Sequence, residues 1–217
     1  MPLPAEGVEV AHLIAIEGAD KVGKSTFVKA LPARIAALRH TVEILPTIRE
    51  SEQFAARFLE LIDDPRRNST EISRLYARHH ARNARLASES SREFAIADRY
   101  IASSCGYSVV YGESDGFLKE LYANVRSPDL GILLTDRQRL LDISGGSFDK
   151  IEEGTQVGHT VLSMREAVEG EIWRWMKQLY PSSLELDQTG LHEPEGLSRI
   201  EAWLEGALRG PSSPPSG

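Results

Sequence analysis

Short runs of apolar residues alternate with longer stretches of helical periodicity along most of this chain. The first run, residues 12–16, is rich in branched side chains and is followed by a glycine, a pattern typical of a buried strand. Four further runs have the same short length and apolar character. The predicted strands are 12–16, 42–45, 94–97, 130–134 and 183–186.

Between these strands, apolar residues recur at intervals of three and four, which predicts helices with one buried face. The longest is preceded by Asn68, Ser69 and Thr70, residue types that cap helix N-termini. The stretch 100–125 is mostly helical, with a break at 112–116. The predicted helices are 25–39, 53–62, 71–89, 100–125, 161–179 and 194–208.

Strands and helices that alternate in this way predict an α/β fold. We expect a five-stranded parallel sheet with helices on both faces, a three-layer sandwich. Such sheets bind ligands at the carboxyl ends of their strands, so the residues that follow the strands are the candidate functional segments. They are 18–25, 46–50, 98–100 and 135–137.

Length and composition fit one domain. The chain has 217 residues, 41% of them hydrophobic, so it can bury a sizeable core. We assign the domain to 11–209, with an N-terminal extension over 1–10 and a tail of Pro, Ser and Gly over 210–217. Residues 144–160 are rich in glycine and polar side chains and are expected to form a mobile lid.

Charge and cysteine content narrow the class further. With 25 basic and 32 acidic residues, the net charge of −7 argues against a general nucleic-acid coat protein but allows a local basic site. The single Cys105 cannot form an internal disulfide, which fits a reducing, cytoplasmic setting. No apolar run reaches the ~18 to 20 residues of a membrane span, and residues 1–12 do not resemble a signal peptide.

The segment after the first strand fits the phosphate-loop pattern, two glycines separated by four residues and followed by Lys and Ser. Gly18 and Gly23 let the backbone turn its amide N–H groups inward, and the following helix adds partial positive charge. Lys24 reaches the β- and γ-phosphates of a nucleoside triphosphate, and the Ser25 hydroxyl binds Mg²⁺. This predicts a P-loop NTPase fold that uses ATP and Mg²⁺. The predicted ATP-binding residues are Gly18, Ala19, Asp20, Lys21, Val22, Gly23, Lys24, Ser25 and Thr26.

Three charged residues extend this site. Asp20 is an acid inside an anion-binding loop, so a cation or an incoming hydroxyl must offset its charge. Lys21 puts a second positive charge at the loop tip, where the γ-phosphate leaves. Asp98, at the end of a buried strand, is placed to hold metal-bound water. The predicted metal ligands are Ser25, Asp20 and Asp98.

Arginines and aromatic residues mark an acceptor side. Arg49 and Arg99 both follow strands, where two guanidinium groups would clamp a monophosphate. On the long helix, Tyr76, His80 and Asn83 share one face, so a ring and two hydrogen-bonding groups are available to read a base. A second stripe of arginines on that helix is interpreted chiefly as a solvated basic face.

Five segments, in order, resemble the thymidylate kinase family. They are LIAIEGADKVGKST around the phosphate loop, TIRE at 47–50, EISRLYARHHARN in the long helix, DRYIASSCGYS at 98–108 and SPDLGILL at 127–134. Many families share the phosphate loop, and the DRY-x-x-SS segment after the third strand is the more specific part. The resemblance runs from about residue 12 to 187.

The resemblance implies an ATP- and Mg²⁺-dependent nucleoside monophosphate kinase, with roles carried over residue by residue. It implies Lys24, Lys21, Arg99 and Asp98 as catalytic residues. Family members are commonly homodimers, and small nucleotides, rather than membranes or nucleic acid, are the expected partners. The implied substrate-binding residues are Arg49, Tyr76, His80, Arg99, Ser104 and Tyr107.

Departures from the family pattern bear on specificity and catalysis. His80 stands where the family usually has a base-contacting arginine, and Ser108 where many members have glutamine. Residues 144–158 contain no arginine, whereas bacterial-type members carry catalytic arginines there. Eukaryotic and viral members instead place a basic residue in the phosphate loop, where this chain has Lys21, so Lys21 is expected to supply the transition-state charge.

The predicted reaction is ATP-dependent phosphorylation of a pyrimidine deoxynucleoside monophosphate, dTMP or a close analogue, to the diphosphate. A deoxynucleoside kinase is one alternative, with Glu50 as the base that its reaction needs, although two arginines that clamp a phosphate argue against it. A kinase of a modified pyrimidine nucleotide, or of a modified base in DNA, is a second. A nucleotide-binding regulator without catalysis is a third.

Overall fold

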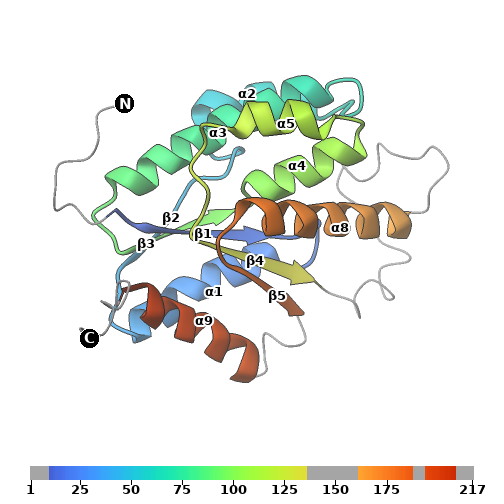
Figure 1. Ribbon diagram of the computed structural model, residues 1–217. Coiled ribbons are helices and arrows are strands. Elements are labelled where there is room, and N and C mark those ends of the chain that lie inside the picture. Colours follow the sequence, from blue (N-terminus) through green and yellow to red (C-terminus); the bar gives the residue numbers. More distant parts are fainter. Residues whose placement is uncertain (1–9, 136–160, 188–193, 209–217) are drawn as a thin grey trace, which may run out of the picture.

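The computed structural model describes residues 10–135, 161–187 and 194–208. Five parallel strands form one sheet in the order β2-β3-β1-β4-β5 (Figure 1). The first strand of the chain is therefore central, with β3 on one side and β4 on the other. The strands are β1 His12–Glu17, β2 Val42–Ile44, β3 Phe94–Asp98, β4 Leu130–Thr135 and β5 Ser183–Asp187.

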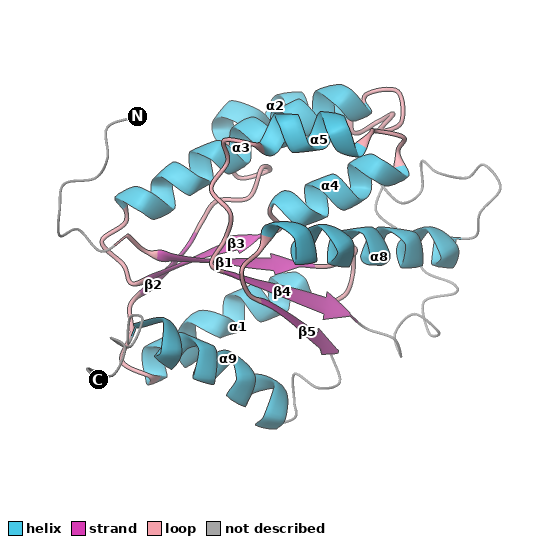
Figure 2. Ribbon diagram, viewed as in Figure 1, coloured by secondary structure: helices cyan, strands magenta, loops and turns pink. Residues whose placement is uncertain are grey.

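Helices cover both faces of this sheet (Figure 2). α1 and α9 pack on one face, and α3, α4, α5 and α8 lie over the other, with α2 beside α3. The predicted α/β fold with a five-stranded parallel sheet is confirmed. The helices are α1 Lys24–Ala37, α2 Glu52–Leu61, α3 Ser69–Glu89, α4 Ile101–Val110, α5 Asp115–Tyr122, α8 Val161–Leu179 and α9 Pro194–Leu208.

The sequence pattern located these elements to within a few residues. The stretch predicted as an interrupted helix divides into α4 and α5 after Gly112, which has a φ of +104°. Asn68 stands at the N-cap position of α3, but its side-chain amide donates to the Leu61 carbonyl oxygen (2.8 Å) instead of capping the helix. The predicted lid, the tail and the extension up to residue 9 lie outside the described residues.

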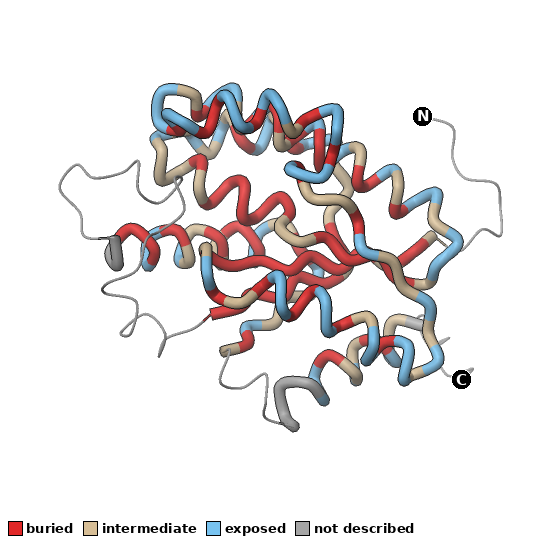
Figure 3. The backbone as a smooth tube through the Cα atoms, turned by 180° about the vertical axis from the view of Figure 1, so that it is seen from behind, coloured by how far each residue is buried: buried red, intermediate tan, exposed pale blue. Residues whose placement is uncertain are grey.

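β1 sends alternate side chains into two apolar cores. Leu13 and Ala15 pack with α3, α4 and α8, whereas Ile14 and Ile16 pack with α1 and α9. Figure 3 shows burial concentrated in the sheet and on the inner sides of the helices. Burial on both faces explains why the first strand reads as an uninterrupted apolar run. Within the described ranges, no helix combines the length and apolar character needed to cross a membrane.

Candidate active site

The phosphate loop links the end of β1 to the start of α1, and two glycines shape its backbone. Gly18 has a φ of +138°, and a Cβ there would lie 2.5 Å from the Leu134 carbonyl oxygen, so only glycine fits against β4. Gly23, with a φ of +82°, is the N-cap of α1, and its carbonyl oxygen accepts hydrogen bonds from the amides of Thr26 and Phe27. The helix N-terminus that follows favours an anion.

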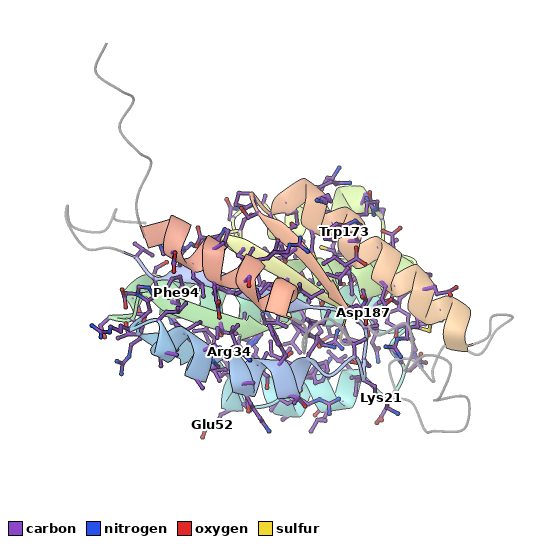
Figure 4. The ribbon with its side chains drawn as sticks, turned by 90° about the horizontal axis from the view of Figure 1, so that it is seen from below. Lys21, Arg34, Glu52, Phe94, Trp173 and Asp187 are labelled. Carbon is purple, nitrogen blue, oxygen red and sulfur yellow. The ribbon has the colours of Figure 1, made fainter. Side chains whose placement is uncertain are left out.

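The two loop lysines differ in environment. Lys24 is nearly buried, and its ammonium donates to the Ala19 carbonyl oxygen, which folds the side chain over the loop. Lys21 is exposed at the loop tip, with a left-handed φ of +63°. Figure 4 shows Lys21 and Asp187 toward the end of the molecule where the strands finish, and Phe94 toward the other end. The lysines therefore stand at the ligand-binding edge of the sheet.

One cleft of about 780 Å³ joins the phosphate loop to α2 and α3. Ala19 and Val22 are buried in the core beneath the loop. Sequence reasoning missed Phe58 and His79, which also line the cleft. His79 follows Tyr76 by three residues, so helical spacing could have revealed it. The predicted site residues that line the cleft are Asp20, Lys21, Gly23, Lys24, Ser25, Thr26, Arg49, Tyr76, His80, Asp98 and Arg99.

Ser25 and Asp98, two of the predicted metal ligands, meet at the base of the loop. The Ser25 hydroxyl donates to Oδ2 of Asp98 over 3.4 Å. Burial raises the pKa of Asp98, although the nearby Lys24 ammonium opposes the shift. A hydroxyl and a partly desolvated carboxylate suit Mg²⁺. In the described part of the chain, no group of three or more His, Cys, Asp or Glu side chains could hold a metal ion, so a cation here would take further ligands from phosphate oxygens or water.

Arg99 connects the acceptor side to the phosphate loop. Its guanidinium donates to the Gly18 carbonyl oxygen (2.8 Å), forms an ion pair with Asp20 and lies 5.2 Å from the ring centroid of Tyr107. The cation that the acidic Asp20 needs is therefore supplied by the protein. Arg99 also has a left-handed φ of +65°, an uncommon backbone conformation that occurs often at functional sites.

Arg49 lines the same cleft from the segment after β2. Its guanidinium carbon lies 5.7 Å from the ring centroid of Phe58 on α2. The neighbouring Glu50 folds back, and its carboxylate accepts hydrogen bonds from the amide and the hydroxyl of Thr47, both at 2.8 Å. The amide hydrogen bond is the main cause that lowers the pKa of Glu50. A carboxylate held in this way is a poor general base, which argues against the deoxynucleoside kinase alternative.

The far wall of the cleft is aromatic and neutral. Tyr76 and His80 stack with ring centroids 5.6 Å apart and planes at 26°. His80 is 1% exposed, and its Nε2 lies 2.8 Å from Ser104 Oγ. Burial holds the pKa of His80 well below its usual value and lowers that of His79 to about 4, so both rings are neutral near pH 7. This wall offers hydrogen bonds without net charge.

Ser104 and Tyr107 do not line the main cleft. They line a neighbouring cavity of about 40 Å³ between α3 and α4, which shares Phe58, Tyr76 and Arg99 with the cleft. The Tyr107 hydroxyl accepts a hydrogen bond from the Asp20 amide over 3.2 Å. Both predicted residues are therefore next to the acceptor wall, and Tyr107 also contacts the phosphate loop.

The fold and the loop define the class of this protein: a P-loop nucleotide-binding protein with a second basic segment facing the loop. The family model described as thymidylate kinase matches residues 16–147, more than half of the chain, and the chain belongs to that family. A search of curated proteins finds no match.

Among solved structures, a thymidylate kinase from Candida albicans is similar with a TM-score of 0.63 at 15% identity, over 92% of this chain and 93% of that chain. That enzyme is described as having broad substrate specificity and a novel structural element. At this identity the likeness supports the fold.

Family membership confirms the predicted resemblance and makes the protein a nucleoside monophosphate kinase, a phosphotransferase that acts on small nucleotides. Members of the family use ATP and typically Mg²⁺. The role of Lys21 as the basic residue of the loop, and the individual site assignments, stay predictions.

Proposed function

We propose that the protein transfers the γ-phosphoryl group of ATP to a pyrimidine deoxynucleoside monophosphate, dTMP or a close analogue, to form the diphosphate. The observation that carries this proposal is the single cleft in which the phosphate loop faces Arg49, Arg99 and the Tyr76 ring. A phosphate-binding loop accounts for the donor, and two guanidinium groups beside an aromatic ring fit a mononucleotide acceptor.

On the donor side, the amides of residues 18–26 and the Lys24 ammonium would hold the ATP phosphates. The Ser25 hydroxyl and the Asp98 carboxylate would hold Mg²⁺, with which they fit as hard oxygen ligands. When bound, Mg²⁺ would neutralise negative charge on the phosphates. The predicted metal role of Asp20 is less supported, because its carboxylate pairs with Arg99.

On the acceptor side, Arg49 and Arg99 would bind the monophosphate and Tyr76 would stack on the base. His80, Ser104 and Tyr107 would border the base or the sugar. Because His80 is neutral and replaces a cationic group of the family pattern, its hydrogen bonds would read the base by geometry rather than by charge.

The transfer itself needs positioning and charge neutralisation. An anionic oxygen of the acceptor phosphate forms the new bond to the γ-phosphorus while the bond from that phosphorus to the β–γ bridging oxygen breaks. The nucleophile carries no proton at neutral pH, so no general base is required, consistent with the hydrogen-bonded state of Glu50. Lys21, at the loop tip, would stabilise the charge on the moving phosphoryl group.

Incubation with ATP and Mg²⁺ and a set of monophosphates tests the proposal, with diphosphate formation as the readout. We expect dTMP or another pyrimidine deoxynucleotide to be the best acceptor. Phosphorylation of a base in single-stranded DNA, with no turnover of free monophosphates, would favour the modified-base alternative. No ATP turnover with any acceptor would favour the regulator.

A further inference from the structure

Glu17, the last residue of β1, carries a fully buried carboxylate, 0% exposed, next to the phosphate loop. Its Oε2 accepts hydrogen bonds from the amide (3.1 Å) and the hydroxyl of Ser103 and from the Tyr100 amide (3.3 Å). Its Oε1 accepts one from the Tyr180 hydroxyl (2.5 Å). A buried carboxylate is costly unless it is fully hydrogen-bonded, and here four donors converge on it.

Three of these donors belong to the start of α4, and the fourth, the Tyr180 hydroxyl, lies just after α8. Tyr100 occupies the N-cap position of α4 without a capping side chain of its own. The Ala102 amide donates to the Tyr180 hydroxyl (2.9 Å), which in turn donates to Glu17. The Tyr100 and Ser103 amides are thus capped by a carboxylate of β1 and the Ala102 amide by the Tyr180 hydroxyl, and a negative charge at a helix N-terminus is favourable.

Arg99 lies between this cap and β3. Its amide donates to the Ile16 carbonyl oxygen (2.9 Å), the next amide, of Tyr100, donates to Glu17, and its guanidinium donates to the Gly18 carbonyl oxygen (2.8 Å). Three consecutive residues at the end of β1 and the start of the loop therefore hold this segment. Ile16 binds the Arg99 amide, Glu17 binds the amide of the next residue, and Gly18 binds the Arg99 side chain. The left-handed φ of +65° at Arg99 is maintained within this frame.

We propose that Glu17 is a positioning residue, which keeps Arg99 of the acceptor site in register with the phosphate loop. The inference rests on the proposed function for Arg99 and adds a residue that does not touch the cleft. A carboxylate suits this place because it only accepts hydrogen bonds, whereas a glutamine of the same shape would aim its amide N–H groups at donors.

Glu17→Gln is the test variant. Misplacement of an acceptor-binding group should raise the KM for dTMP and lower kcat by about tenfold or more, with the KM for ATP within about threefold of wild type. Leu204→Ala, a buried residue of α9 on the opposite face of the sheet, is the control for lost stability alone. An equal loss of kcat/KM for dTMP in Leu204→Ala at matched melting temperature would reduce Glu17 to a structural role.

The Arg99→Ala background shows whether Glu17 acts through Arg99. We expect Glu17→Gln to cost little further activity there, and losses that multiply in full would overturn the proposal. Tyr180→Phe removes one partner of Glu17 and should have a smaller effect than Glu17→Gln.

Hydrogen exchange gives a readout independent of catalysis: the amides of Tyr100 and Ser103 should exchange faster in Glu17→Gln and not in Leu204→Ala. If no monophosphate is phosphorylated by wild type, the proposed function fails, whereas unchanged exchange in Glu17→Gln contradicts the cap itself.

Discussion

At the scale of single residues, the basic side chains of the cleft differ in how they are held. Lys24 is folded against the loop and Arg99 is tied to Gly18 and Asp20, so both are held before substrates arrive. Lys21 is exposed at the loop tip. We propose that this ammonium stabilises the charge on the phosphoryl group in the transition state.

Replacement of this lysine tests that assignment. In Lys21→Ala we expect kcat to fall by roughly 10²- to 10³-fold, the typical effect of one charge-stabilising group. Steady-state kinetics with saturating ATP and acceptor measures it. Lys177→Ala removes an exposed lysine of α8 that stacks on Trp173 and should leave kcat unchanged. A kcat for Lys21→Ala within about twofold of wild type would show the assignment to be wrong.

The sequence predicted which functional residues lie at strand ends, but it did not predict which of them form ion pairs with one another. Arg49, Asp98 and the phosphate loop line one cleft, as the carboxyl-edge rule requires. The pairing of Arg99 with Asp20 was not predicted, because it joins residues that are far apart in the chain. Its geometry depends on the close contact of β1 and β3.

At the scale of elements, α3 buries several polar residues, while Arg74, Arg78 and Arg85 on the same helix are exposed. His79 and His80 of this helix are buried where they line the cleft, and desolvation is the main cause that lowers both pKa values. The Arg82 guanidinium adds to the effect on His79. These imidazoles stay neutral in the folded protein but can bind a proton in the unfolded chain. The free energy of unfolding therefore depends on pH.

Acid should therefore destabilise the protein. Below the usual histidine pKa of 6.5, His79 is protonated in the unfolded chain, whereas in the folded protein it stays neutral down to about pH 4. Stability therefore falls as the pH drops through this window. One such histidine contributes about 1.4 kcal/mol per pH unit, or on the order of 3 kcal/mol across the window. Urea unfolding at about pH 7.5 and about pH 5 measures the slope, which should be shallower in His79→Gln. An identical slope in both proteins would contradict this interpretation of α3.

The contact between α4 and α8 is close enough to require glycine. A Cβ on Gly106 would lie 2.7 Å from Ile172 Cγ1 and 3.0 Å from the Ile172 backbone nitrogen. We expect Gly106→Ala to lower the free energy of unfolding by about 1–3 kcal/mol through overpacking. Gly170→Ala, on the exposed side of α8 with open space around it, should be neutral or stabilising by up to about 1 kcal/mol. Chemical denaturation compares them, and equal stability of the two variants would refute the packing argument.

Element positions were predictable because apolar periodicity is local. The strands, α8 and α9 fall where the pattern placed them to within a few residues, since a buried face imposes its period on the sequence. The N-cap of α3 was not predictable in detail. Asn68 has a competing acceptor, the Leu61 carbonyl oxygen, which lies within reach only because α2 and α3 pack together.

At the scale of the whole molecule, the strand order brings the proposed donor and acceptor residues to one cleft. The central β1 ends in the phosphate loop, and its neighbour β3 ends in Asp98 and Arg99. β2, beyond β3, leads to Arg49. The alternation of elements predicted the parallel sheet, but the order of its strands depends on long-range pairing that no local pattern encodes.

The two arginines should act together on the acceptor. A charge-assisted hydrogen bond contributes about 1.5–3 kcal/mol, so Arg49→Ala and Arg99→Ala should each lower kcat/KM for dTMP by about ten- to 150-fold. Arg49→Ala should leave the KM for ATP nearly unchanged, since the proposal assigns Arg49 to the acceptor phosphate. Arg78→Ala, an exposed residue on the outer side of α3, serves as the control. A raised KM for ATP with an unchanged kcat/KM for dTMP in Arg49→Ala would contradict the assignment of Arg49 to the acceptor.

The most direct test of the account compares thymidine with its monophosphate as acceptors for the wild-type protein. Two guanidinium groups that clamp a phosphate predict a kcat/KM for dTMP at least about 100-fold above that for thymidine. Equal or better use of thymidine would contradict the account, because a neutral nucleoside has no phosphate for Arg49 and Arg99 to hold.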